Sequence, residues 1–308
     1  MPSLADDPSD DNHHDLLTQL NHEREIAVAS YKKWLPVGLG GGVLLGLGIG
    51  VATMEPLAGA IALIVGMVAG WALARIPVFS FNSSLKERLV KRVINERGFV
   101  YSPSGGAFSL RPLKRVLPGY DRESREDYIA GDINGVDFSA VEIHLEDRRT
   151  RTDSKGRTTT YYVTVFRGRV ASYDMHKAFK NPIILSTNTW DLLGSLSNVF
   201  TGLEQVKLED PEFEKMFDTY GTDQVEARYI LTPGMMERLK DIRRRHGGLE
   251  AVFDGGKIHL AISTGQNLFE DGYKGSAITR SSIAAILSDV DHITGVASQL
   301  GLDAKTKI

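Results

Sequence analysis

The chain of 308 residues is 42% hydrophobic and 24% charged, with a formal net charge of −3. The charges are unevenly spread, because the 41 residues between Lys33 and Arg75 carry one charge, Glu55, and include 27 apolar residues and 10 glycines. This distribution excludes a wholly soluble domain, a polytopic transporter and a disordered chain. It predicts a membrane anchor followed by a water-soluble domain large enough to bury its own core.

The first 33 residues divide into an acidic tail and a helix. Residues 1–14 contain four aspartates, two prolines and few apolar side chains, so we expect them to be disordered. Asp15 can cap a helix over residues 15–33, which carries a series of leucines and leads into the apolar block. We therefore expect a juxtamembrane helix in front of the anchor.

The apolar block, residues 34–78, contains two segments of transmembrane length. Trp34–Thr53 has twenty residues without a charge, which as a helix reach about 30 Å, the thickness of a bilayer's hydrocarbon core. Leu57–Ala74 is nearly as long, and the intervening Met54-Glu55-Pro56 favours a break, because proline suits the first turn of a helix. The block therefore predicts a two-helix transmembrane hairpin rather than a cleaved signal peptide.

The positions of lysine and arginine predict the orientation of this hairpin. Basic residues precede the first segment and follow the second, whereas the short turn has none. Because cytoplasmic flanks are enriched in Lys and Arg, both termini are expected in the cytoplasm and the anchor in the inner membrane. Trp34 and Trp71 lie near the same face, where indole rings favour the headgroup boundary. The lipid bilayer is thus the first expected partner.

Small residues recur every four positions in both apolar segments. They are Gly38, Gly42, Gly46 and Gly50 in the first segment, and Ala62, Gly66 and Gly70 in the second. Small residues at this spacing allow close backbone packing, which is the main attraction between helices in lipid. We expect the two stripes to face each other or a second copy of the chain, and the second possibility implies self-association.

A basic linker helix is predicted over residues 79–98. Ser83 or Ser84 can cap it. Its apolar side chains share one face of the helix, and basic side chains lie around the other face. Residues 75–119 carry a net charge of +7, whereas residues 120–308 carry −5. The candidates for contact with anionic lipid are Lys86, Arg88, Lys91 and Arg92. The alternative is that these residues only obey the positive-inside rule.

Residues 99–308 are expected to form a cytoplasmic α+β domain with antiparallel hairpins. One hairpin turns at Asn134-Gly135, and another at Asp254-Gly255-Gly256, because these dipeptides accept positive φ angles. Further strands are expected at Thr159–Ala171 and Pro182–Ser186. Helices are expected to start at Asp210, at Thr222 or Asp223, at Thr232, and at Thr279, the last ending near Leu300. The apolar stripe of that final helix is typical of a core.

The sequence contains few motifs that indicate a particular chemistry. The sequence lacks the P-loop, dinucleotide-binding, nucleophile-elbow and zincin motifs, and its lack of cysteine excludes thiol and iron–sulfur chemistry. Glu142, His144 and Glu146 lie too far apart on a strand to bind one small ion, so no metal and no cofactor are expected.

The segment 148–157 is the most basic part of the domain. Its cations are Arg148, Arg149, Arg151, Lys155 and Arg157. We interpret it as a flexible, solvated hairpin tip, with contact to a partner or an anion such as a lipid phosphate as the alternative. Nucleic acid is not expected, since no aromatic residue is interleaved to stack a base.

The segment from Asp210 to Asp223 contains carboxylates beside Phe213 and Phe217 that are candidates for acid–base chemistry. The alternative is a helix start that complements its dipole with acidic residues and buries its phenylalanines. Arg228 is expected to pair with Glu214 or Asp210, tying two helices together.

Short segments of the domain are also similar to a known family. They are Val165-Phe166-Arg167-Gly168, Asp210-Pro211-Glu212-Phe213-Glu214, Gln224 to Pro233 and Met235 to Leu239. Across residues 30–265 the chain resembles the bacterial membrane family called domain of unknown function 3137, whose motif positions here include Asp210, Phe213, Glu214, Phe217, Glu226, Arg228 and Pro233. The resemblance implies a two-span anchor and a cytoplasmic domain, and it implies no reaction or ligand.

The leading hypothesis is a non-enzymatic, membrane-anchored protein whose cytoplasmic domain binds a partner protein or regulates assembly. The first alternative is a membrane-tethered hydrolase or transferase that uses carboxylates near Asp210–Asp223. The second is an oligomeric channel or export component.

Overall fold

The computed structural model describes residues 8–187, 202–264 and 278–302. Its contacts divide the chain into two units, Met1–Val90 with Glu270–Ala285, and Lys91–Phe269 with Ile286–Ile308. The first unit contains the long apolar helices and the second contains a sheet. The mixed α+β class predicted from the sequence is confirmed.

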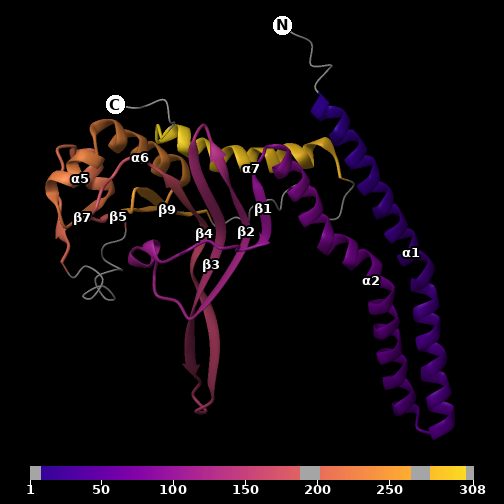
Figure 1. The fold of residues 1–308 in the computed structure, drawn as a ribbon. Coiled ribbons are helices and arrows are strands. Elements are labelled where there is room, and N and C mark those ends of the chain that lie inside the picture. The colour runs from indigo at the N-terminus through magenta and orange to yellow at the C-terminus, as the bar shows by residue number, and fades with distance from the viewer. Residues whose placement is uncertain (1–7, 188–201, 265–277, 303–308) are drawn as a thin grey trace. The chain divides into compact units, whose positions relative to one another are not determined.

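Two long helices form an antiparallel hairpin (Figure 1). Helix α1 spans Pro8–Thr53 and α2 spans Pro56–Glu96. The turn between them, Met54-Glu55, falls where the sequence predicted it, and Met54 takes a positive φ of 54°. The predicted pair of long apolar helices is therefore confirmed.

Both helices extend beyond their predicted ends. Helix α1 begins at Pro8, so it includes residues 8–14 of the predicted acidic tail, and residues 1–7 lie outside the described part. Helix α2 continues through the predicted cap at Ser83 or Ser84 without a break. Ser84 Oγ donates to the carbonyl oxygen of Phe81 in the preceding turn, at 3.1 Å, so this hydroxyl is satisfied inside the helix. The predicted linker helix is the last part of α2.

The second unit is built on one antiparallel sheet. Its strands are β1 Val100–Ser104, β2 Arg122–Ile133, β3 Val136–Thr152, β4 Thr158–Asp174, β5 Ile183–Ser186, β6 Glu204–Gln205, β7 Asp218–Gly221, β8 Leu249–Asp254 and β9 Lys257–Ser263. In the described residues the strand order is β1-β2-β3-β4-β9-β8-β5-β7-β6. Each neighbouring pair is antiparallel. Three of the pairs, β2–β3, β3–β4 and β8–β9, are hairpins between consecutive strands.

The predicted hairpin turns are confirmed. Asn134 and Gly135 join β2 to β3 with φ angles of 54° and 85°, as a type I′ turn requires. Gly255 and Gly256 join β8 to β9 with φ angles of 58° and 77°. A bulge in β2 was not expected: Asp127 is buried at a register shift and accepts a 2.7 Å hydrogen bond from the Tyr101 hydroxyl on β1.

The two faces of the sheet are covered differently. Val141, Val170 and Val252 face a cluster supplied by residues 108–117, which include the 3-10 helix η1, Pro112–Arg115. Tyr173, on the opposite face of β4, donates from its hydroxyl to the carbonyl oxygen of Ile293 at 2.8 Å. That carbonyl belongs to α7, Arg280–Gln299, so a helix covers the second face. The buried residues Ile286, Val290, Ile293, Ala297 and Leu300 confirm the predicted core stripe of this helix.

Three short helices lie between β6 and β8 in the chain, each capped as predicted. Asp210 caps α4, Pro211–Met216; Asp223 caps α5, Gln224–Ile230; and Thr232 caps α6, Pro233–His246. Each cap side chain accepts hydrogen bonds from backbone N–H groups of the first turn. Helix α4 ends before Phe217, because the chain turns into β7, a short strand that the sequence did not predict.

Candidate functional site: an apolar helical hairpin and a charged domain surface

The hairpin exposes a continuous apolar surface. Leu44, Val51 and Leu57 are 72%, 78% and 71% exposed, and charged neighbours are absent from this stretch except at Glu55. Both helices are long and apolar enough to cross a membrane, and only 11% and 17% of their most apolar windows are buried. The core helix of a soluble protein buries such a surface, whereas these two helices leave most of it exposed among the described residues.

The glycine stripe of α1 packs directly against α2. A Cβ atom built on Gly38 would lie 2.6 Å from the carbonyl oxygen of Gly70, and one built on Gly42 would overlap the backbone of Gly66. Near the turn, Gly46 lies against Leu63 and Gly50 against Gly59. Of the two arrangements expected, the structure therefore shows the stripes facing each other within one chain. Ala62 is not among the atoms nearest these glycines; Gly59 and Leu63 occupy the contact instead.

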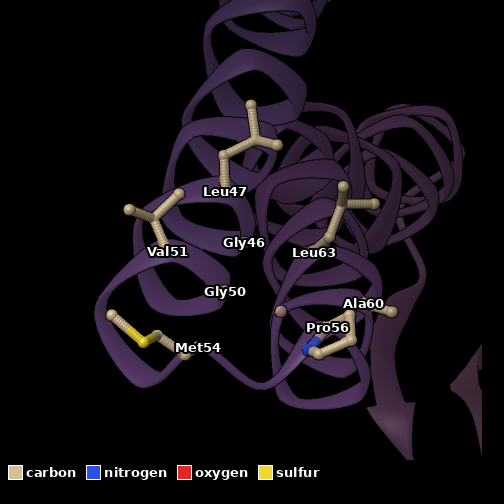
Figure 2. Close-up of a pocket in the computed structure, with 9 residues that line it drawn as sticks. Gly46, Leu47, Gly50, Val51, Met54, Pro56, Ala60 and Leu63 are labelled. Carbon is tan, nitrogen blue, oxygen red and sulfur yellow. The ribbon is translucent and has the colours of Figure 1, made fainter.

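A groove of about 410 Å³ lies between the helices beside the turn (Figure 2). Leu47, Val51 and Met54 border one side in Figure 2, Ala60 and Leu63 border the other, and glycines lie between them. Every residue lining the groove is apolar or glycine. The groove therefore offers no group for acid–base or metal chemistry, and it suits only an apolar occupant.

Cations mark the end of the apolar surface opposite the turn. Because Gly38 contacts Gly70, Lys33 and Arg75, each five residues further from the turn, lie at one level of the hairpin. Lys33 Nζ lies 5.9 Å from the ring of Trp34, and the Arg75 guanidinium lies 4.7 Å from the ring of Trp71. From this level to the turn, Trp34–Thr53 rises about 30 Å as a helix.

The four predicted lipid-contact residues lie further along α2. Arg88 is thirteen residues beyond Arg75, about 20 Å along the helix. Its guanidinium forms a bidentate ion pair with the carboxylate of Glu23 on α1. These hydrogen bonds lower the pKa of Glu23. Arg92 pairs with Glu96 at 2.8 Å, while Lys86 and Lys91 complete the set. Contact of these residues with lipid remains a prediction, and Arg88 and Arg92 already have carboxylate partners.

The basic segment 148–157 is a strand ribbon rather than a loop. Strands β3 and β4 pair as far as Thr152 and Thr158, so Arg148, Arg149 and Arg151 lie on β3. The turn is held by Asp153, which accepts from the backbone N–H groups of Lys155 and Arg157 at 2.9 Å. The segment is thus the tip of a hairpin, as the sequence predicted, and its strands pair close to the turn because the threonines on both strands favour pairing.

The motif residues around α4 have structural partners. Asp210 accepts from the N–H groups of Glu212 and Phe213, at 2.9 and 3.0 Å. Phe213 is fully buried, with its ring centroid 4.9 Å from that of Phe217. Glu214 Oε1 accepts from the N–H of Leu208 at 2.8 Å. These positions therefore hold α4 and the segments beside it.

The expected partner of Arg228 was wrong. Its guanidinium donates to the carbonyl oxygens of Lys207 and Gln224, at 2.9 and 3.1 Å, and not to Glu214 or Asp210. Glu226 accepts from the N–H groups of Lys180 and Asn181, at 2.9 and 3.0 Å, which lowers its pKa. Side chains of α5 thus bond to backbone atoms of two loops. A sequence does not reveal such partners, because every residue type has the same backbone groups. Pro233 occupies the first turn of α6.

A buried lysine that the sequence did not single out completes this region. Lys240 of α6 is 1% exposed, and its Nζ lies 2.7 Å from Asp210 Oδ2, 3.2 Å from Glu212 Oε2 and 2.7 Å from Glu237 Oε1. Its position four residues after the buried Met236, on the apolar face of α6, is the signal that could have found it. The ion pair lowers the pKa of Asp210, and the bonds from Arg244 and Lys240 lower that of Glu212.

The Lys240→Met variant is expected to unfold at a lower urea concentration than the native chain at pH 7. The ionised carboxyls stabilise the fold above their ordinary pKa values of 3.8 and 4.5, and this contribution is lost as the pH falls through the lowered values. The difference between the two proteins should therefore shrink at pH 3. Lys215→Met, at an exposed position of α4, is the control. An equal difference at both pH values would contradict the ion pair.

Three of the carboxylates near Asp210 have structural partners. Asp210 and Glu212 bond to cations, and Asp223 caps α5 with bonds of 2.8 and 3.1 Å. The lowered pKa values of Asp210 and Glu212 are opposite to what a general acid at neutral pH requires. The hairpin groove, a cavity beside Trp71 and a cavity beside α7 are lined by none of them. Among the described residues, no group of three potential metal ligands comes together.

A cavity of about 30 Å³ lies between the sheet and α7, lined by Arg169, Tyr173, His246 and His292. The rings of the two histidines are 6.5 Å apart. Burial and nearby cations lower the pKa of His246, so this ring is neutral at pH 7. Arg169 pairs with Asp289 at 3.2 Å, while its buried Nε has no hydrogen-bond partner among the described residues. The cavity's size and this free donor suit an ordered water.

Together these features define an α+β protein with an apolar helical hairpin and a charged sheet domain. Residues 164–302 match the model of the family described as "Protein of unknown function (DUF3137)". The predicted resemblance is thus confirmed from β4 to α7, whereas residues 30–163 lie outside the match.

Two further comparisons were made. No curated protein matches the chain. The crystal structure of the mycobacterial trehalose monomycolate transport factor A, TtfA, is 13% identical over 70% of this chain and 96% of that one, with a TM-score of 0.33. This similarity is too small to transfer a fold or a role.

Proposed function

We propose that the chain is a membrane protein anchored by the α1–α2 hairpin, whose sheet domain binds a protein partner. The carrying observation is the exposed apolar surface of the hairpin, which extends about 30 Å from the turn and ends at Lys33, Arg75 and their tryptophans. This arrangement of length, apolarity and interfacial residues matches what a bilayer requires of a spanning hairpin.

The same geometry supports a common side for both ends of the anchor. A hairpin that crosses twice returns to the side on which it started, and the cations lie at that end. Because Lys and Arg favour the cytoplasmic side, we place the chain in the inner membrane with both termini in the cytoplasm.

A binding role for the domain is supported by α5. Val225 and Tyr229, one turn apart, are 78% and 59% exposed, while their motif neighbours Ala227 and Ile230 are fully buried. Tyr229 also has Lys177 Nζ 5.3 Å from its ring. Exposed aromatic and branched side chains on a rigid helix are typical of small protein-binding surfaces.

The anchor is tested by fractionation and by thiol labelling. The full chain should stay in the membrane pellet after a carbonate wash. Since the chain has no cysteine, Met54→Cys at the turn and Ser154→Cys in the domain each introduce the only thiol. An impermeant maleimide should label Cys variants at these two positions from opposite sides of sealed vesicles. Release by carbonate, or labelling of both positions from one side, would overturn the anchor.

A further inference from the structure

The β3–β4 hairpin continues beyond the rest of the sheet (Figure 1). Strand β2 stops pairing with β3 at Glu146, and β9 stops pairing with β4 at Gly168. The outer part, residues 148–162, is called the exposed ribbon here, because each of its residues is exposed. Strands of this length extend a two-stranded ribbon by about 20 Å.

The exposed ribbon has an unusual composition for this domain. Of its fifteen residues, five are Lys or Arg, six are Ser or Thr, two are Tyr, and none is aliphatic. It carries a net charge of +4, whereas the rest of residues 120–308 carries −9. Cations and hydroxyl groups are the side chains that bind phosphate oxygens, so this surface is complementary to a phosphate-bearing partner.

Only some of these cations have a carboxylate partner. Arg149 pairs with Asp147 at 3.3 Å, and Arg157 pairs with Asp153 at 3.1 Å. The side chains of Arg148, Arg151 and Lys155 form no ion pair within 4 Å among the described residues, although the charge of Arg148 helps to lower the pKa of Asp121. Arg151 and Lys155, and in part Arg148, therefore keep their charge available for an external anion.

We propose that the exposed ribbon binds the anionic phospholipid headgroups of the bilayer that holds the hairpin, a proposal that rests on the anchoring function above. Tethering keeps the domain close to the headgroups, and each Lys or Arg at an anionic surface adds attraction. Tyrosine suits the headgroup layer, and Tyr161 and Tyr162 are 45% and 40% exposed. The lack of aliphatic side chains indicates contact at the surface without insertion.

A nucleic acid fits these observations less well. Register places Tyr162 opposite Arg148, so aromatic residues do accompany the cations, which the sequence alone did not show. However, the Arg122 guanidinium lies 3.9 Å from the ring of Tyr162 and covers one of its faces. Sequence-independent binding of single strands needs open aromatic faces on which bases stack.

The test uses the full chain in liposomes, with a fluorophore on Ser154→Cys at the ribbon turn and a quencher on the lipid headgroups. Quenching should be strong with phosphatidylglycerol and weak with phosphatidylcholine, and it should fall in high salt. Neutralising Arg148, Arg151 and Lys155 to Gln should lower the ratio of quenched to unquenched label about a hundredfold, because each charge is worth about 1 kcal/mol.

The matched control neutralises Lys207, Lys215 and Lys257, three exposed lysines outside the ribbon, and should retain the quenching. Quenching that is independent of lipid charge, or equal loss in both triple variants, would overturn the proposal. Weak quenching with phosphatidylglycerol, together with a change of label fluorescence on adding single-stranded DNA, would overturn it in favour of a nucleic acid. Carbonate resistance of the same liposomes shows separately whether the anchor itself holds.

Discussion

Replacing Gly42 with leucine is expected to force α1 and α2 apart. A Cβ at this position overlaps the backbone of Gly66, which cannot move aside as a flexible side chain can. Overpacking of this kind costs about 1–3 kcal/mol, and helices in lipid depend mainly on close packing for their association.

Gly41→Leu is the matched control, because a Cβ on Gly41 meets nothing within 4 Å. It should leave the hairpin closed and favour the helix by up to about 1 kcal/mol. Spin labels on Leu45→Cys and Ile64→Cys, at exposed positions of the two helices, report their separation. A longer and broader distance distribution is expected for Gly42→Leu only. An unchanged distribution in that variant would contradict the glycine contact.

The second large effect is expected at Phe213. This side chain is fully buried against Phe217, so Phe213→Ala should cost about 3–5 kcal/mol of unfolding free energy through lost burial and a residual cavity. Tyr229→Ala, at an exposed position of the same family motif, should change it by less than about 0.5 kcal/mol.

Urea denaturation of the purified full chain measures both variants. Comparing the two variants distinguishes two roles of motif residues: Phe213 packs in the core of the domain, whereas Tyr229 is exposed and available to a partner. If Tyr229→Ala were as destabilising as Phe213→Ala, the exposed surface of α5 would be part of the fold, and its proposed binding role would lose its support.

These expectations also bear on the alternatives to a binding role. The carboxylates considered for catalysis are occupied as caps and ion-pair partners, so the observations give a tethered enzyme no support. The glycine stripe considered for oligomerisation is used inside one hairpin, so the oligomeric channel likewise gains no support from it.

Elements defined by local interactions were predictable. The turns at Asn134 and Gly255, and the caps at Asp210, Asp223 and Thr232, depend on residues within four positions of one another. The strands β1, β6 and β7 were missed because they are short and owe their pairing to distant segments. The continuity of α2 was missed because Ser83 or Ser84 was expected to begin a new helix. Instead, the helix continues, and the Ser84 hydroxyl donates to a carbonyl oxygen of the preceding turn.

The amino-acid sequence alone determined that the chain has an apolar hairpin of membrane length and an α+β domain, since hydrophobic length, turn dipeptides and caps act over short distances. Only the tertiary structure decided that the glycines of α1 contact α2, that Lys240 forms an ion pair with Asp210, and that the basic segment is an exposed ribbon. These features join residues far apart in the chain, and the physical reason is that burial and charge pairing depend on which surfaces meet in space.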